Sequence, residues 1–182
     1  MIWLILTCIA IGIFVAYNII VDCLLKTLPY SLSGTYYLLN DKWKGSGIAF
    51  SIMMIVVFLL LIAPWMSLTT VISSWSQYLT ILPFICCGCM MFVGIAPNIK
   101  SSERIEKIHI ISALVGAITA MLWVCIVCWK LMWLIPAWGL VIGGIAHLTK
   151  TAKSSRDYWL EMVAFGSTFT AILVEMTLIY GV

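Results

Sequence analysis

The chain has 182 residues, of which 64% are hydrophobic and only 9% are charged, and its mean hydropathy is +1.14. So few polar residues cannot cover the surface of a soluble globular protein, which excludes that class and predicts an integral membrane protein. The formal net charge is +3, but the basic residues are scattered among hydrophobic segments rather than gathered in a stripe. This pattern argues against nucleic-acid binding.

Residues 1–182 are predicted to form one all-α domain, a polytopic transmembrane helical bundle with about six spans of roughly 20 apolar residues each. The first span covers residues 2–25, which lack the basic start and the cleavage site of a signal peptide. The longest connection, residues 26–46, contains Pro29 and Gly34, which argue against a continuous helix. Its aromatic residues suit the headgroup zone, so we expect a loop that lies against the bilayer.

The next two spans are predicted over residues 47–65 and 77–96. Proline removes a backbone N–H and clashes with the preceding turn, so Pro64 is expected to end the second span and Pro83 to kink the third. Six of the seven cysteines fall within apolar spans, where cysteine is expected to act as a small hydrophobic residue.

The fourth and fifth spans, residues 108–129 and 131–149, are predicted to form a tightly packed antiparallel hairpin, and the sixth span covers residues 159–182. Ser101, Ser102 and Glu103, in the polar connection before the hairpin, resemble a helix start. Small residues at four-residue spacing allow helices to approach closely in a membrane. In the hairpin these positions are Ser112, Gly116 and Ala120 on one span and Gly139, Gly143 and His147 on the other.

The distribution of basic residues predicts the orientation of the six spans. Nine of the ten Lys and Arg residues fall in the first, third and fifth connections, and Lys130 alone falls on the opposite side. Positively charged connections stay on the cytoplasmic side of a membrane. We therefore expect these three connections in the cytoplasm, both termini on the non-cytoplasmic side, and the bacterial inner membrane as the location.

The same topology brings polar residues together near the cytoplasmic interface. An antiparallel hairpin places the start of one helix level with the end of the next, so both histidines are expected at this face. The predicted ligand-binding cluster consists of Asp22, Ser31, Ser33, Tyr36, His109, His147 and Glu161. It can bind a lipid headgroup or a small ligand. The alternative is that each polar residue caps a helix end or bonds a neighbour.

Two further interpretations involve ions. His109, His147 and Glu161 supply the ligand types of a divalent metal site with an open position, which could activate water against a lipid ester or amide. A haem between the two histidines is disfavoured, because the glycine stripes imply helices packed too closely. Glu161, Thr168 and Glu175 lie close to one face of the last span, expected to look into the bundle, and with Asn18 they could line an ion path.

The order Pro29, Ser31, Ser33, Thr35 after the first span, followed by His109 and small residues at the fourth span, resembles the DRAM/Sfk-like group of small six-helix membrane proteins. It also resembles uncharacterised bacterial membrane proteins of similar layout. The resemblance implies a role linked to membrane lipids, no established enzymatic activity, and a shared site at Ser31, Ser33 and His109.

The leading hypothesis is a non-enzymatic six-helix membrane protein whose cytoplasmic-side cluster contacts a lipid headgroup or small ligand. The expected partners are membrane lipids, a second copy of the chain or other membrane subunits. One alternative is an oligomeric channel or membrane-perturbing effector, and another is a metal-dependent lipid hydrolase with a divalent metal as cofactor. The sequence contains no nucleotide-binding or serine-hydrolase motif.

Overall fold

The computed structural model describes residues 1–72, 76–96 and 103–180, and their regular structure is helical. Five apolar helical segments among them are long enough to cross a membrane. They are α1 (Ile2–Leu25), α3 (Ile48–Ile72), α6 (Glu103–Ile126), the segment Trp129–Leu148 that joins the short helix η2 (Trp129–Leu131) to α7 (Leu134–Leu148), and α8 (Arg156–Tyr180). A sixth apolar helix, α5 (Ile81–Ile95), has 15 residues. These lengths and compositions fit a membrane-embedded protein.

Several predicted boundaries are wrong, and one of the errors involves a proline. Pro64 does not end its helix, because α3 continues to Ile72 with Pro64 inside it. Neighbouring helices and local adjustments can satisfy the backbone groups that proline frees in a membrane helix. Pro83 lies in the first turn of α5, and the chain departs from a continuous helix just before this proline. The predicted third span is divided at Thr80 into α4 (Ser76–Leu79) and α5.

The first connection is also more ordered than expected. It contains a nine-residue helix, α2 (Gly34–Lys42), and residues 31–35 are buried rather than spread on the surface. The preceding residues 26–33, called the α1–α2 loop below, pack against the start of α8. Tyr158 N donates to the carbonyl of Tyr30 at 2.8 Å, and Ser155 Oγ donates to that of Leu28 at 3.4 Å. The first connection is therefore fixed to the last helix.

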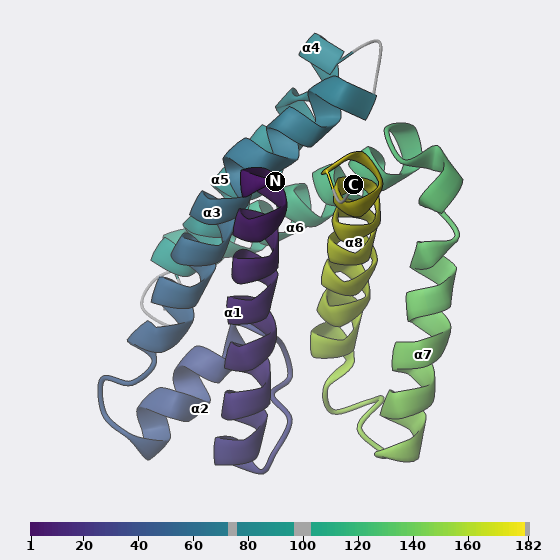
Figure 1. The fold of residues 1–182 in the computed structure, drawn as a ribbon. Coiled ribbons are helices and arrows are strands. Elements are labelled where there is room, and N and C mark those ends of the chain that lie inside the picture. The colour runs from purple at the N-terminus through teal and green to yellow at the C-terminus, as the bar shows by residue number, and fades with distance from the viewer. Residues whose placement is uncertain (73–75, 97–102, 181–182) are drawn as a thin grey trace.

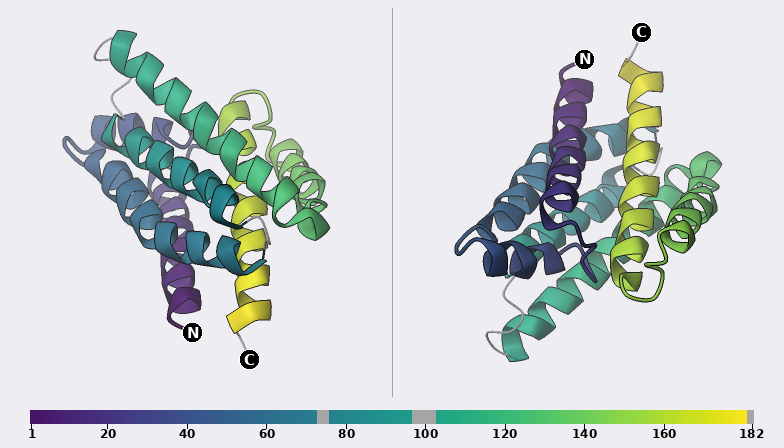
Figure 2. Two further views of the ribbon diagram at one scale, coloured as in Figure 1. Left: turned by 90° about the horizontal axis from the view of Figure 1, so that it is seen from above. Right: turned by 90° about the horizontal axis from the view of Figure 1, so that it is seen from below.

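The long helices form two layers that cross at an angle (Figures 1 and 2). One layer consists of α3, α5 and α6, with α5 packed against both of its neighbours. The other consists of α1, α8 and α7, with α8 between the other two. Contacts of α3 with α1 and of α6 with α8 join the layers. The start of α1 and the end of α8 lie at the same end of the bundle (Figure 1).

The predicted hairpin is not a tightly packed unit. Gly116 of α6 faces α5, where an added Cβ would lie 2.5 Å from Met90 Cε. On α7, Gly139 and Gly143 have no neighbouring atom within 4 Å of such a Cβ. Instead α7 packs on α8, where Gly166 receives the ring of Trp138. Small residues do permit a close helix contact here, but the contact of Gly116 joins α6 to α5. The small residues of α7, Gly139 and Gly143, face away from the neighbouring helices.

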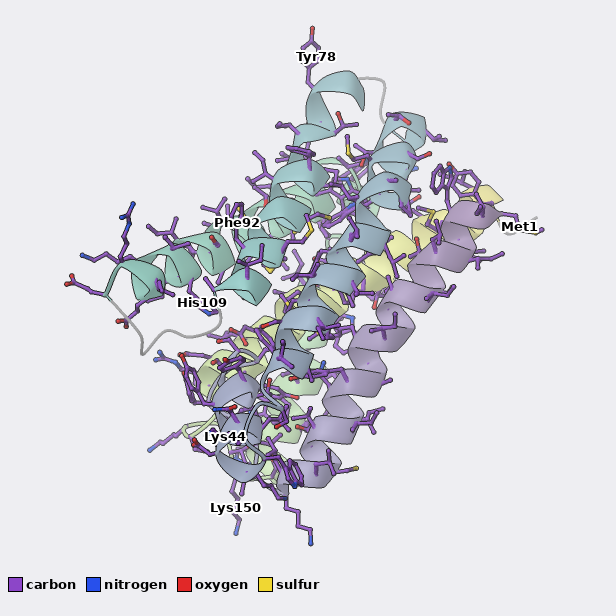
Figure 3. All side chains as sticks on the ribbon, turned by 90° about the vertical axis from the view of Figure 1, so that its left-hand side faces the viewer. Met1, Lys44, Tyr78, Phe92, His109 and Lys150 are labelled. Atoms are coloured by element: carbon purple, nitrogen blue, oxygen red, sulfur yellow. The ribbon has the colours of Figure 1, made fainter. Side chains whose placement is uncertain are left out.

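Lys42, Lys44 and Lys150 lie at one end of the bundle, called the lysine end below. Figure 3 shows Lys44 and Lys150 at this end, and Met1 and Tyr78 toward the opposite end. Lys42 at the end of α2 donates to the carbonyl of Leu24 in the last turn of α1, so this charge also lies at the end where α1 finishes.

Candidate ligand-binding cavity

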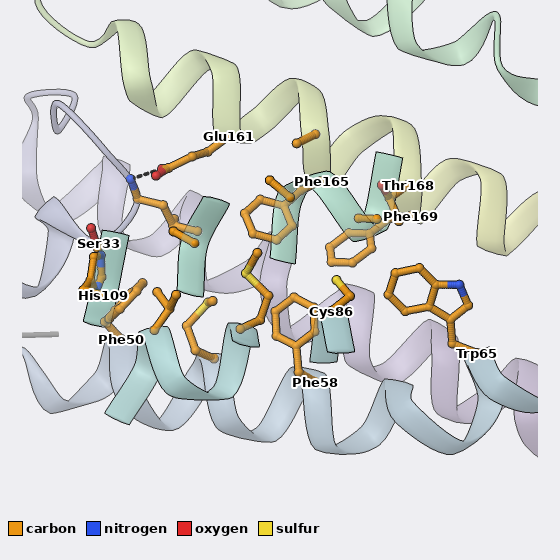
Figure 4. A pocket seen from close by; sticks show the side chains of 18 residues that line it. Ser33, Phe50, Phe58, Trp65, Cys86, His109, Glu161, Phe165, Thr168 and Phe169 are labelled. Atoms are coloured by element: carbon orange, nitrogen blue, oxygen red, sulfur yellow. Dashed lines mark hydrogen bonds between the residues drawn. The ribbon is translucent and has the colours of Figure 1, made fainter. Parts of the chain in front are cut away.

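An elongated cavity lies between the two layers (Figure 4). The space open to the centre of a water molecule is about 60 Å³. One wall comes from α3, α5 and α6, and the facing wall comes from α8 and the end of the α1–α2 loop. Polar side chains lie at the two ends of this cavity, and the middle is apolar.

The first polar end is formed by Ser33, His109 and Glu161, which Figure 4 shows at the same end of the cavity. The Glu161 carboxylate accepts a hydrogen bond from the backbone N–H of Leu32. A carboxylate offers about four lone-pair sites, so this bond leaves acceptor capacity for a ligand. Ser33 is 5% exposed, and its Oγ lies 3.2 Å from Ser31 Oγ. We call this end the polar mouth.

His109 is held by the end of a neighbouring helix. Its Nδ1 lies 3.0 Å from the carbonyl oxygen of Ala96, which caps the C-terminus of α5. The last carbonyls of a helix have no intrahelical partner, so a histidine N–H donated to them stabilises that end. The imidazole therefore has a structural role as a helix cap in addition to its place at the polar mouth.

The middle of the cavity has aromatic and methionine walls with alanines between them. Phe58 of α3 faces Phe165 and Phe169 of α8, with ring centroids 6.1 and 6.5 Å apart. On α6, Ala113 and Ala117 follow His109 at four-residue spacing and line the same cavity. Because alanine side chains end at Cβ, this face of α6 leaves the space that the cavity occupies.

The second polar end contains Thr168 and Trp65, which lie together at the far end of the cavity in Figure 4. Thr168 is 2% exposed and Trp65 is fully buried. Thr168 Oγ1 and Trp65 Nε1 have no hydrogen-bond partner among the described residues. Buried polar groups in proteins are nearly always paired, so this inner end is chemically unusual.

No family model, curated protein or solved structure matches this chain. The resemblance to the DRAM/Sfk-like group therefore stays a prediction.

The structure brings only part of the predicted cluster to the cavity. Ser33, His109 and Glu161 line it, whereas Asp22 is bonded by Tyr158 Oη at 3.3 Å outside it. Ser31 supports the polar mouth through its bond with Ser33, and Tyr36 packs on Tyr37 with ring centroids 5.4 Å apart.

The two predicted histidines do not line the same cavity. His147 is exposed on the last turn of α7 and does not line the cavity that contains His109. The reason is the tilt of α6, which packs on α5 instead of running beside α7 as a hairpin partner.

The predicted metal ligands do not assemble either. Within the part of the chain that the structure describes, no group of three His, Cys, Asp or Glu side chains is close enough to hold a metal ion. His109 and Glu161 both reach the polar mouth, but the third predicted ligand, His147, lies elsewhere. All seven cysteines are free.

The predicted ion path is divided. Glu161 and Thr168 do look into the bundle, as expected from their shared helix face. Glu175 instead lines a separate cavity of about 400 Å³ beside Lys130, and Asn18 donates to the carbonyl of Phe14 in its own helix.

The sequence interpretation missed the apolar wall and the inner end of the cavity. A signal for the wall was present on α3, where large apolar residues recur at helical spacing. The positions that line the cavity are Phe50, Met54, Phe58 and Trp65, all of them buried. The missing polar partner of Trp65 has no sequence signal, because it depends on which helices surround the indole.

Proposed function

We propose that this chain is a non-enzymatic membrane protein that binds a lipid-like amphiphile in the cavity between its two layers. The polar head of the ligand contacts Ser33, His109 and Glu161, and its apolar part lies along the phenylalanine and alanine walls. The observation that carries the proposal is the position of the polar mouth at one end of an otherwise apolar cavity. Ligand sites are typically concave and mainly apolar, with a few polar groups that fix orientation.

The proposal includes the topology expected from the sequence. Six spans with both termini outside are supported by the common position of Lys44 and Lys150 at one end, and of the start of α1 and the end of α8 at the other. The 15 residues of α5 form a helix about 22 Å long, which is shorter than the roughly 30 Å of a bilayer core. In the proposed topology, α4 and α5 together form the third span. The positive-inside rule places the lysine end in the cytoplasm of a bacterial cell.

The polar mouth then lies on the side of the bundle where the α1–α2 loop joins α8. This loop lies at the end of the bundle that carries Lys42, Lys44 and Lys150. An anionic head group on the ligand would therefore also be attracted by the surrounding positive charge. A carboxylate on the protein repels an anion, and a head that donates a hydrogen bond to Glu161 avoids this cost.

Native mass spectrometry of the protein released from nanodiscs tests the proposal. The wild-type protein is expected to retain a co-purified amphiphile. The substitution Ala117→Leu fills the apolar middle and is expected to remove that adduct. The matched control is Ala49→Leu, because Ala49 is exposed on α3 and lies outside the cavity. Equal retention by the wild type and both variants would contradict the proposed site.

A further inference from the structure

A second cavity, of about 400 Å³, lies at the end of the bundle opposite to the lysine end. Its walls come from the ends of α3 and α6, from η2 and from the last turns of α8, which finishes at this end in Figure 1. Sites for small ligands typically have volumes of about 300–1,000 Å³, so this cavity has room for a lipid headgroup. We call it the Lys130–Glu175 cavity, after the two charged residues that line it.

The two charged residues face the same cavity without forming an ion pair. The charge of Lys130 acts on the Glu175 carboxylate through space. Among the described residues, however, the ion pairs with N and O within 4.0 Å are Lys107 with Glu103 and Arg156 with Asp157. The Lys130 ammonium and the Glu175 carboxylate are therefore further apart than this distance. A ligand that carries both a positive and a negative group can lie between them.

The ends of two helices add to the negative side of this cavity. α6 ends at Ile126, and Leu178 lies in the last turn of α8, and both residues line the cavity. The C-terminus of a helix carries a partial negative charge and attracts cations. Together with Glu175, these helix ends favour a cationic group on the ligand. Lys130 is the one basic residue in the α6–α7 connection, so it supplies the position for an anionic group.

The hydrogen-bonding groups specify which zwitterion fits. A primary ammonium can donate hydrogen bonds to the Glu175 carboxylate, and a phosphate can accept from the Lys130 ammonium. A quaternary ammonium has no N–H to donate, and proteins usually bind it with aromatic faces. Trp129 lines the cavity, but its ring already lies beside the protein's own cation, with Lys130 Nζ 5.9 Å from the ring centroid. The cavity therefore favours phosphoethanolamine over phosphocholine.

Exposed apolar side chains at the cavity favour a lipid over a soluble compound. Ile126 is 52% exposed, Trp129 is 62% exposed and Leu178 is 69% exposed, and all three line the cavity. Tryptophan is enriched at the level of the lipid headgroups. Acyl chains attached to the headgroup can cover Ile126 and Leu178, whereas a soluble phosphoethanolamine compound would leave them uncovered.

We infer that the Lys130–Glu175 cavity binds the headgroup of phosphatidylethanolamine, with its ammonium bonded to Glu175 and its phosphate bonded to Lys130. The two-carbon linker of the headgroup keeps the phosphate away from the carboxylate. This inference goes beyond the proposed function, because it assigns a second lipid site at the other end of the bundle. It does not require a ligand in the cavity between the two layers.

Native mass spectrometry of the protein released from mixed nanodiscs tests this site. The nanodiscs contain equal amounts of phosphatidylethanolamine, phosphatidylcholine and phosphatidylglycerol with identical acyl chains. The wild-type protein is expected to retain phosphatidylethanolamine about fivefold more often than either other lipid, as a charge-assisted bond in a partly exposed site predicts. Glu175→Gln keeps the shape of the side chain and removes its charge, so the ratio should fall toward one. Lys130→Gln, at an exposed position, should lower the retention of phosphatidylethanolamine.

The controls change the same residue types elsewhere. Glu103→Gln and Lys107→Gln remove the charges of an exposed pair at the start of α6, the end of this helix that lies away from the cavity. Both variants should keep the full preference for phosphatidylethanolamine. Ala117→Leu fills the cavity between the layers and should also keep it, which separates this site from the proposed function.

The outcomes distinguish the two proposals. The inference is overturned if the wild-type protein shows no preference for phosphatidylethanolamine, or if the preference survives in both Glu175→Gln and Lys130→Gln. A preference that is lost in Ala117→Leu but kept in Glu175→Gln would place the lipid between the layers, which supports the proposed function and overturns the inference. If Ala117→Leu keeps every adduct and Glu175→Gln loses the preference, the proposed function fails and the inference stands.

A competition experiment separates the lipid from a soluble source of the same headgroup. Glycerophosphoethanolamine is added to the nanodiscs at the concentration of phosphatidylethanolamine before the protein is released. The lipid adduct is expected to remain, because the soluble compound has no acyl chains to cover Ile126 and Leu178. Loss of the lipid adduct, with the soluble compound bound in its place, would overturn the assignment of a lipid to this cavity.

Discussion

Replacement of Gly94 by alanine is expected to destabilise the layer that forms one wall of the cavity. A Cβ at Gly94 of α5 would lie 2.9 Å from Met54 Cβ and 3.1 Å from the carbonyl oxygen of Ser51, both on α3. Ordinary carbon contacts begin near 3.5 Å, so α3 and α5 would have to separate by roughly half an ångström. Overpacking of this kind costs about 1–3 kcal/mol in the free energy of unfolding.

Gly88→Ala provides the control, because Gly88 lies on the same helix and has no atom within 4 Å of an added Cβ. Both substitutions gain about 0.5–1 kcal/mol by removing a glycine from a helix, so this gain cancels in the comparison. The unfolding midpoint of Gly94→Ala should lie below that of Gly88→Ala by about 2–4 °C for each kcal/mol of difference. Thermal unfolding in nanodiscs measures both, and equal midpoints would refute the close contact between α3 and α5.

Three further predictions concern the polar mouth and the topology. Glu161→Leu removes the acceptor of the Leu32 N–H, so chymotrypsin should cleave the α1–α2 loop faster than in the wild-type protein. Glu161→Gln keeps an acceptor and should protect the loop. Equal cleavage rates in all three proteins would contradict this role of Glu161. His109→Ala should lower the free energy of unfolding by about 1 kcal/mol, because the end of α5 loses its cap. His147→Ala changes an exposed residue and should have little effect. A larger loss of stability in His147→Ala than in His109→Ala would contradict the structure. In a background without native cysteines, Lys44→Cys and Tyr78→Cys should react with an impermeant thiol reagent from opposite sides of the membrane, and labelling from one side would disprove the six-span topology.

The fold was predictable wherever a long apolar segment determines a helix by itself. Residues 2–25 were predicted as the first span, and α1 has these bounds. The end of α3 was not predictable from Pro64, because the effect of a proline depends on whether neighbouring helices and side chains satisfy the freed carbonyl. The helix α2 was missed because its nine residues carry turn-forming and polar side chains, and it is held in place by tertiary contacts such as the hydrogen bond between Thr35 and Tyr17.

The candidate site was predictable only at its polar residues. The spacing of Glu161 and Thr168 correctly indicated a helix face that looks into the bundle, since carboxylates are costly in lipid. The stripe of small residues around Gly116 indicated a close helix contact but not the helix that makes it, and α5 rather than α7 is the neighbour. The pairing of helices depends on the summed packing of several faces, which a single pattern of spacings does not contain.

The position of α8 in the chain has a consequence for biogenesis. The wall formed by α3, α5 and α6 is synthesised before α8, and α8 supplies both the facing wall and the anchor of the α1–α2 loop. Until α8 packs in place, the apolar wall formed by the earlier helices therefore has no partner on its open side. Packing of α8 supplies the facing wall, so the cavity forms only after α8 has been synthesised.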